Sequence, residues 1–176
     1  NMEFYWSYAN FKDGMKLVRE MYIEIAEKVF GTTKFTSRGH TFDLNNDWPE
    51  IDYRDEVLKQ TGIDIETASE KEMENKLREL GVEYDGTNKE RLMDTLWKYC
   101  RKNITGPAFL INHPTLVAPL AKSNTGGKTV QRFQPIFAGS AVGNGYSELN
   151  DPLDQRARFE VQQKLIDKGD EEAMMA

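Results

Sequence analysis

Residues 143–152 carry the clearest pattern in the chain and read Gly143-Asn144-Gly145-Tyr146-Ser147-Glu148-Leu149-Asn150-Asp151-Pro152. Asn144, Tyr146 and Glu148 occupy alternate positions, so on an extended strand their side chains all point to one face. Asp151-Pro152 has the form of a helix start, with Asp as the cap and Pro at the first helical position. The stretch therefore predicts a strand with one polar face that leads directly into a helix.

The polar face of this strand has the chemistry of a small-molecule pocket. An Asn amide can hold a carboxylate, a Glu can pair with an ammonium group, and the two neighbouring glycines allow close approach. We interpret the face as a site for a small zwitterion. A solvated edge strand would give the same alternation. Glu3 and Tyr5, which repeat the pairing of Glu and Tyr at the same spacing, favour the pocket.

The segments around this strand predict further sheet and helix. Strands are expected at 108–111, at 129–138 and, as the partner of the latter, at 141–148, with a turn or mobile loop at 123–128. The helix that starts at Asp151 has an apolar stripe at helical spacing, made of Leu153, Ala157, Val161 and Leu165.

The start of the chain predicts a strand, a helix and a hairpin. Residues 2–9 alternate and are aromatic, which is typical of a strand buried on at least one face. A helix is expected after Asp13 and is expected to end at Gly31, with the apolar positions Met15, Val18, Tyr22, Ile25 and Val29. Residues 33–37 and 40–45, joined through Arg38-Gly39, predict a hairpin.

Residues 51–104 change in character to short helices with high charge. Ser69 with Glu72, and Thr87 with Glu90, have the spacing of capping boxes. We interpret this stretch as a small helical insertion without a catalytic element. Together the elements predict an α+β fold, a mostly antiparallel sheet flanked by helices, within one domain that spans 1–176.

Other residues with reactive side chains are weaker candidates. His113 is expected to be a loop histidine with an ordinary hydrogen bond, and His40 an exposed residue of the hairpin. Cys100 has no histidine near it in sequence and is expected to be a small buried residue. Residues 126–128 lack the spacing of a phosphate-binding loop, and no Cys/His cluster has zinc spacing.

Composition and charge set the class of protein. The 176 residues are 39% hydrophobic and 30% charged, which is typical of one folded domain, and no apolar run reaches the roughly 20 residues that cross a bilayer. The net charge of −6 argues against non-specific nucleic-acid binding. A single cysteine fits a reducing, cytoplasmic setting. Both ends are expected to be truncations, with 169–176 the first turns of a cut helix.

Three segments resemble class II lysyl-tRNA synthetase, and in the same order along the chain. Residues 2–10 resemble the second strand of that family's motif 2 and the turn that follows it. Residues 113–122 resemble its His-Pro…Ser-Pro-Leu-Ala-Lys signature, with Ala118 in place of the usual Ser. Residues 144–151 resemble its Asn-Gly-aromatic-Ser-Glu-Leu-Asn-Asp block, which is highly specific. The resemblance covers essentially the whole chain and implies an internal piece of the catalytic domain.

The resemblance implies roles for the five polar residues named above. Glu148 and Tyr5 would hold the ε-ammonium of lysine, and Tyr146 would line the channel for its side chain. Asn144 would contact the α-carboxylate, and Glu3 would support the same pocket. A carboxylate at the end of the channel would select a long cationic side chain, because an unpaired buried Glu penalises neutral competitors.

The chain departs from the family at two positions that matter for catalysis. The family places two glutamates before the Asn-Gly block, where they bind the Mg²⁺ that bridges the ATP phosphates; this chain has Gln134 and Ala141 there. Neither side chain supplies the anionic oxygen that Mg²⁺ prefers. The family's motif 1, the motif 2 Arg, motif 3 and the anticodon-binding domain are not in these residues. No catalytic or ATP-binding residue can therefore be assigned.

The resemblance implies a parent protein that activates L-lysine with ATP and transfers it to tRNA(Lys), and that forms a homodimer. The isolated segment is expected to be inactive. Two alternatives stay open. One is a paralogue that ligates lysine to a protein. The other is a non-catalytic synthetase-like module that binds an amino acid.

Overall fold

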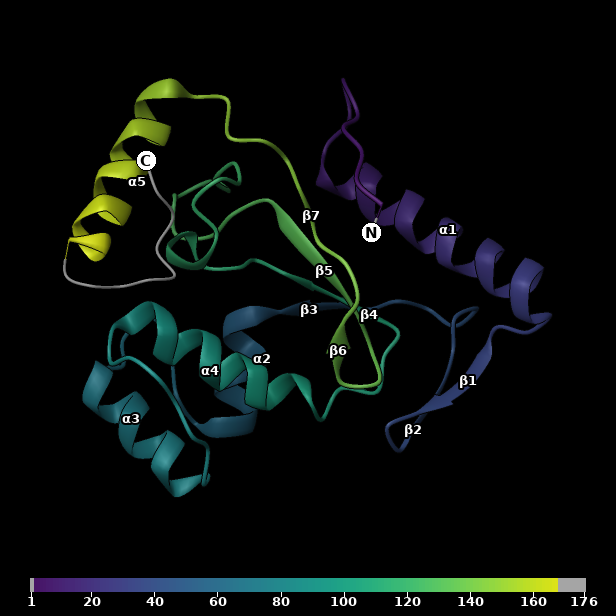
Figure 1. The fold of residues 1–176 in the computed structure, drawn as a ribbon, viewed down its shortest axis with the longest axis horizontal. Helices are drawn as coiled ribbons and strands as arrows, with labels where there is room; N and C mark the ends of the chain where they lie inside the picture. The colour runs from purple at the N-terminus through teal and green to yellow at the C-terminus, as the bar shows by residue number, and fades with distance from the viewer. Residues whose placement is uncertain (1, 168–176) are drawn as a thin grey trace.

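The computed structural model describes residues 2–167, and a five-stranded sheet forms its centre (Figure 1). The strand order is β3 (Glu50–Asp52), β4 (Ala108–Ile111), β5 (Arg132–Phe137) and β6 (Ser140–Ala141), and β7 (Gly145–Tyr146) also pairs with β5. Strand β3 runs parallel to β4, and the other pairs are antiparallel. Helices and a mixed sheet make this an α+β fold, as the sequence predicts.

The strand predicted at 141–148 is divided in the structure. Both β6 and β7 pair with β5, but residues 142–144 between them lie outside any strand. The strand predicted at 129–138 is confirmed over 132–137 and is preceded by bridges from Thr129 to Pro114 and from Val130 to Ser123. The interruption leaves the polar residues after Val142 at the end of the sheet.

Helix α1 (Phe11–Phe30) begins earlier than the sequence predicts. The Asn10 side chain accepts hydrogen bonds from the backbone N–H groups of Lys12 and Asp13, and the Asp13 carboxylate accepts one from the Asn10 N–H at 2.9 Å. Asp13, after which the helix was expected, thus lies inside it as the third residue of a capping box. Gly31 ends the helix with φ 67°, as predicted.

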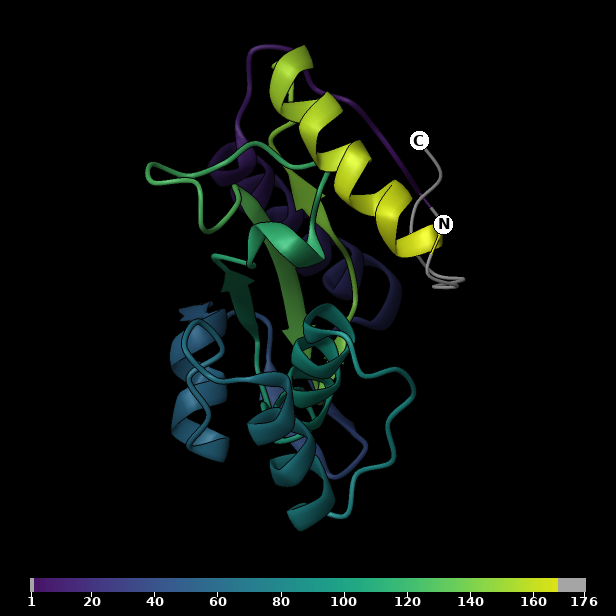
Figure 2. The ribbon, with the colours of Figure 1, turned by 90° about the vertical axis from the view of Figure 1, so that its left-hand side faces the viewer.

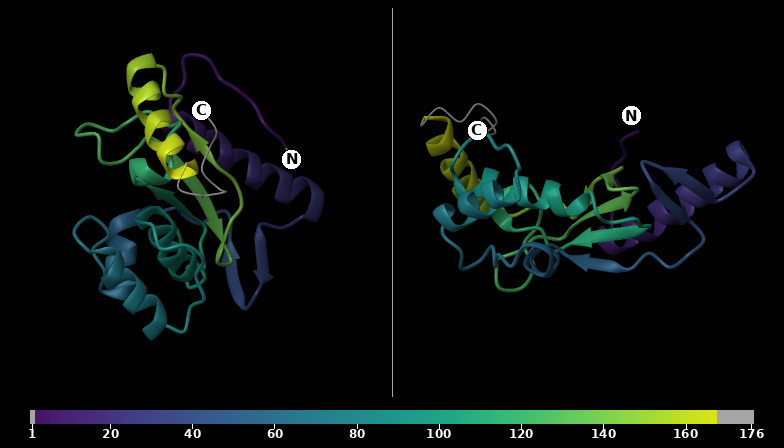
Figure 3. Two further views of the ribbon diagram at one scale, coloured as in Figure 1. Left: turned by 60° about the vertical axis from the view of Figure 1, so that its left-hand side comes forward. Right: turned by 90° about the horizontal axis from the view of Figure 1, so that it is seen from below.

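The hairpin after α1 is confirmed. Strands β1 (Lys34–Ser37) and β2 (His40–Asp43) are antiparallel, and Arg38 and Gly39 between them have φ values of 49° and 81°. Positive φ at both turn residues is the geometry that matches the twist of a two-residue hairpin. The hairpin lies at the opposite end of the molecule from α5 (Figures 1 and 3).

One face of the sheet packs against α1 through aromatic side chains. Phe109, Phe133 and Phe137 of the sheet join Trp48 and Met15 in this core. The Trp48 ring lies 5.0 Å from that of Phe109 and 4.9 Å from that of Phe137, measured between centroids. Ile25 and Val29, two of the apolar positions at helical spacing, are exposed, because the helix extends past the edge of the sheet.

The other face of the sheet packs against a group of three helices, which Figure 2 shows below the sheet: α2 (Tyr53–Thr61), α3 (Glu70–Glu79) and α4 (Lys89–Arg101). Leu110 and Ile136 contribute the sheet's part of this core. The capping box of Ser69 and Glu72 is confirmed. The predicted cap Thr87 is wrong: α4 is capped one residue later by Asn88, which accepts a hydrogen bond from the Arg91 N–H at 2.9 Å.

Helix α5 (Pro152–Ile166) has the predicted start but a different buried face. Asp151 accepts hydrogen bonds from the N–H groups of Leu153 and Asp154. The predicted apolar stripe is wrong where it is described: Leu153 is 79% exposed and Val161 46%. Among the described side chains of α5, Arg158 and Gln162 are buried. The side chain of Leu165 and the predicted helix at 169–176 lie outside the described residues.

The polar face of α5 is buried because its neighbour is polar. Arg158 donates to the carbonyl oxygens of Pro119 and Ala121, at 3.1 and 2.8 Å, and to the Ser123 hydroxyl at 2.7 Å. It also pairs with Asp154 one turn earlier. A guanidinium satisfies the backbone acceptors of this loop, whereas a leucine would leave them without donors.

The strand predicted at 2–9 is wrong. These residues form no strand, and Tyr5, Trp6 and Tyr8 are exposed. A strand exists only where a neighbour accepts and donates its backbone hydrogen bonds, and no segment within 2–167 pairs with this one. Within the same described part of the chain, no helix is both long and apolar enough to cross a membrane.

Candidate functional site

A cavity of about 670 Å³ lies between the N-terminal segment and the end of the sheet. Its size falls in the range of roughly 300–1,000 Å³ that is usual for small-molecule sites. All five residues that the sequence singles out line it: Glu3, Tyr5, Asn144, Tyr146 and Glu148. The fold thus brings together two segments that are about 140 positions apart in the sequence.

Two hydrogen bonds hold the walls of the cavity together. The Ser147 hydroxyl accepts a hydrogen bond from the Phe11 N–H at 3.1 Å, which joins the residue after β7 to the first turn of α1. On the other side of the same residue, the Ser147 carbonyl accepts one from the Lys122 N–H at 2.8 Å. Ser147 therefore fixes both the N-terminal segment and the loop before β5 against the polar strand.

The cavity wraps around β7, so residues on both sides of this strand reach it. Gly145 and Ser147 line it as well as the alternate residues Tyr146 and Glu148. Gly145 is required by packing: a Cβ atom there would lie 2.5 Å from two atoms of the Phe133 ring. The absence of a side chain lets β7 lie directly on the aromatic core.

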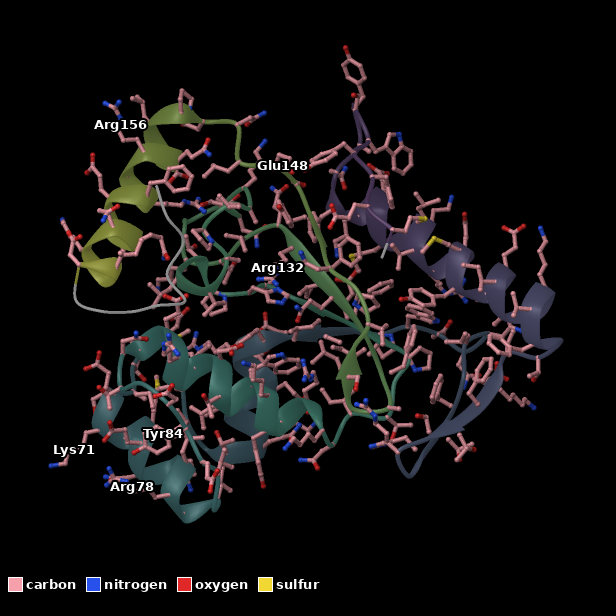
Figure 4. All side chains as sticks on the ribbon, in the orientation of Figure 1. Lys71, Arg78, Tyr84, Arg132, Glu148 and Arg156 are labelled. Atoms are coloured by element: carbon pink, nitrogen blue, oxygen red, sulfur yellow. The ribbon has the colours of Figure 1, made fainter. Side chains whose placement is uncertain are left out.

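Acidic groups dominate one part of the cavity. Tyr146 is half-buried, and its phenol pKa is raised, first by burial and then by Glu148, Tyr5 and Glu3. Glu148 is exposed to the cavity, and within residues 2–167 its carboxylate accepts no hydrogen bond (Figure 4). An unpaired carboxylate beside a second one and two phenols favours a cationic ligand.

Asn144, which also lines the cavity, is next to a positively charged side chain. Its Oδ1 atom accepts a hydrogen bond of 2.6 Å from Nε of Arg132. Arg132 is on β5, opposite Tyr146 in the register of the sheet, and its Nη1 donates to the Val117 carbonyl at 3.2 Å. Burial lowers the pKa of Arg132, but an arginine stays protonated. The cavity is therefore acidic around Glu148 and has a cation behind Asn144.

Several residues of the cavity were not assigned from the sequence. Lys122, Gln131 and Asn150 line it, as does Trp6. Lys122 and Asn150 lie inside the segments that resemble the synthetase family, so their position in those segments is the signal that could have found them. Arg132 lies behind the cavity wall and gives no signal in the sequence pattern.

The two histidines lie elsewhere and differ from the predictions. His113 is buried at 2% exposure, and within residues 2–167 neither ring nitrogen completes a hydrogen bond, although the Gln134 side chain and the Arg132 backbone lie near. Burial, with Arg132 second, lowers its pKa to about 3. His40 is half-buried and bonds through its ring to Thr105 and to the Lys102 carbonyl.

Cys100 is buried, as predicted. Burial, and to a smaller extent the negative charge of Glu56, raises the pKa of its thiol to about 12. The thiol therefore stays protonated at neutral pH and does not form the nucleophilic thiolate. Neither Cys100 nor the histidines border the cavity.

The positions that would hold a metal in the synthetase family do not fit Mg²⁺ here. Gln134 and Ala141 lie on one face of neighbouring strands, because Gln134 is two residues from Ile136, which pairs with Ala141. A neutral amide and a methyl group supply no anionic oxygen. Within residues 2–167, no group of three or more His, Cys, Asp or Glu side chains is arranged to hold a metal ion.

Comparison with known proteins identifies the relatives of this chain. Residues 1–175 match the model of a family described as tRNA synthetases class II (D, K and N). Lysine–tRNA ligases from Fervidobacterium nodosum and Thermosipho melanesiensis are 37% and 38% identical over 99% of this chain and 35% of their own length. That of Porphyromonas gingivalis is 36% identical over 98% of this chain and 30% of its own length. The chain spans about a third of the length of these relatives.

Proposed function

This chain belongs to the class II tRNA synthetases of the D, K and N group, and from that premise we propose that it supplies the lysine pocket of a protein that activates L-lysine with ATP and transfers it to tRNA(Lys). The observation that carries the proposal is the single cavity lined by Glu3, Tyr5, Asn144, Tyr146 and Glu148. Relatives named lysine–tRNA ligase, at 35–38% identity, support the choice of amino acid.

The charges of the cavity match the two ends of lysine. Glu148 and the Tyr5 hydroxyl would bind the ε-ammonium, with Tyr146 along the aliphatic chain and Glu3 adding negative charge. The Asn144 amide would donate to the α-carboxylate. A neutral side chain of the same length would leave Glu148 desolvated and without a partner, which is the basis for selection against it.

The reaction itself needs groups outside this chain. Formation of lysyl-adenylate is an in-line displacement at the α-phosphate of ATP, and catalysis there rests on positioning and on charge stabilisation. This segment would hold the attacking carboxylate in place through Asn144. It would therefore be inert alone, and lysine-dependent pyrophosphate exchange by residues 1–176 in isolation would contradict that. Residues 51–104 would be an insertion in the catalytic domain, and the whole protein a homodimer.

The test uses the full-length protein that contains this chain. Glu148→Gln keeps the shape of the side chain and removes its charge, so the affinity for L-lysine measured by calorimetry should fall about 10- to 100-fold. Affinity for norleucine, which lacks the ammonium group, should not fall. Glu160→Gln on α5, away from the cavity, is the matched control. Unchanged lysine affinity in Glu148→Gln would refute the assignment of the pocket.

One observation favours a second candidate function, a synthetase-like module that binds an amino acid without activating it. Gln134 and Ala141 lack the carboxylates expected for Mg²⁺ at these positions. Lysine binding without lysine-dependent pyrophosphate exchange by the full-length protein would favour this module. Exchange activity would exclude it. A paralogue that attaches lysine to a protein would show exchange activity but would not charge tRNA(Lys).

A further inference from the structure

We propose that Arg132 is a positioning residue for amino-acid recognition: it fixes the amide of Asn144 so that the amide donates to the carboxylate of the bound amino acid. This inference rests on the proposed function and deepens it. Arg132 does not line the cavity, so it acts through Asn144 and not by contact with the ligand.

The chemistry of the two side chains sets the direction of the amide. A guanidinium has five N–H donors and no acceptor, so the atom of Asn144 that faces Arg132 Nε at 2.6 Å is the oxygen Oδ1. The nitrogen Nδ2 then points away from Arg132. Within residues 2–167, no group accepts a hydrogen bond from Nδ2, and Asn144 borders the cavity. Two N–H donors are thus left for a ligand, which suits a carboxylate and not a second cation.

Arg132 is itself held in one place. Its Nη1 donates to the Val117 carbonyl at 3.2 Å, and β5 carries it in register with Tyr146 of β7. No Asp or Glu within the described residues forms an ion pair with it. Its charge is therefore not neutralised by a salt bridge, and its Nε–H donates to Asn144 as a charged donor.

This arrangement surrounds the cavity with charged groups of both signs. The acidic side chains Glu3 and Glu148 lie on the same cavity as Asn144, which is backed by the Arg132 cation. Figure 4 labels Arg132, on β5, and Glu148, two residues after β7. A zwitterionic amino acid with a cationic side chain matches this pattern, with its carboxylate towards Asn144. Arg132 would then decide whether the carboxylate is recognised, and would have little effect on recognition of the side chain.

The test measures two ligands that differ only at the carboxylate, with the full-length protein. L-Lysine carries the carboxylate, and L-lysinamide replaces it with a neutral amide. In Arg132→Met we expect the affinity for L-lysine to fall about 10- to 100-fold, the usual effect of losing a hydrogen bond to a charged group. The affinity for lysinamide should change less than about threefold. Arg132→Lys, which keeps a donor, should recover part of the lysine affinity. Arg156→Met on α5 is the charge-matched control, because Arg156 is exposed and far from the cavity (Figure 4).

A double-mutant cycle distinguishes a positioning role of Arg132 from a general loss of structure. Adding Arg132→Met to Asn144→Ala should not weaken lysine binding beyond Asn144→Ala alone, because the two residues act as one unit. An equal loss for lysine and lysinamide in Arg132→Met would overturn the inference, since that is the pattern of a structural role. Full lysine affinity in Arg132→Met would overturn it too, while leaving the proposed function intact. A wild-type protein that does not bind lysine would overturn both.

Discussion

The helix α5 is expected to depend on one buried arginine and not on its apolar stripe. The Arg158 side chain is 9% exposed and makes hydrogen bonds to Asp154, Ser123 and the carbonyls of Pro119 and Ala121. Arg158→Met keeps much of the volume but removes every one of these donors. The buried Ala121 carbonyl, the part-buried Pro119 carbonyl and the Asp154 carboxylate then lose their partner.

The size of the effect follows from the exposure of the partners. Removing one member of a buried ion pair costs about 3–5 kcal/mol. Asp154 is 36% exposed and can be solvated in the variant, so we expect a value of about 3 kcal/mol, near the lower end of that range. Because 1.4 kcal/mol is a tenfold change in an equilibrium constant, the opening of α5 should become roughly 100-fold more favourable.

Native-state hydrogen exchange of the full-length protein measures this opening directly, because the α5 amides exchange through it. Two controls separate the arginine from the rest of the helix. Arg156→Met removes an exposed charge two residues earlier, and Leu153→Ser removes an apolar side chain that is 79% exposed. Both should change the opening free energy by less than about 0.5 kcal/mol. If Leu153→Ser accelerates exchange as much as Arg158→Met, then the buried face of α5 is the apolar stripe after all.

Three further perturbations test other parts of the structure. The pKa of His113 is about 3 in the fold and near 6.5 when unfolded, so the unfolded chain takes up the proton first as the pH falls. The contribution of neutral His113 to the free energy of unfolding is therefore complete above about pH 6.5 and should be lost towards pH 3. The slope should reach up to about 1.4 kcal/mol per pH unit. His113→Phe should flatten the dependence of the urea midpoint between pH 7 and 5, and an unchanged slope would show that another group is responsible. Gly145→Ala should destabilise by about 1–3 kcal/mol in chemical denaturation, because its Cβ meets the Phe133 ring; a cost that does not shrink in a Phe133→Leu background would refute that cause. The double change Gln134→Glu with Ala141→Glu places two carboxylates on one face, so Mg²⁺ should then raise the Tm, whereas the wild-type protein and each single variant should respond less.

Local sequence patterns predicted an element correctly where interactions within a short stretch decide its structure. The Arg38-Gly39 hairpin, the stop at Gly31, the capping box of Ser69 and Glu72, and the start of α5 at Asp151 are all decided by hydrogen bonds or backbone angles within a few residues. The cap Asn88 was missed because Thr87 beside it has the capping-box spacing with Glu90, and the start of α1 was placed after Asp13, past its cap Asn10. Such errors shift a boundary and leave the element intact.

The sequence named five residues that line one cavity, but not the geometry that brings them together. Alternation placed Asn144, Tyr146 and Glu148 together, and the matching spacing of Glu3 and Tyr5 suggested a common pocket. The sequence could not show that Ser147 joins the two segments, or that Arg132 lies behind Asn144, because both contacts cross between elements far apart in the chain.

Tertiary structure alone decided which surfaces are buried. Residues 2–9 have the composition of a strand, yet within the described residues they have no partner for their backbone and lie exposed. Helix α5 buries Arg158 and leaves Leu153 in solvent, because the loop beside it presents carbonyl oxygens and not methyl groups. Periodicity reports the side chains of one segment, whereas burial depends on the chemistry of the segment packed against it. That neighbour is set by the fold of the whole chain.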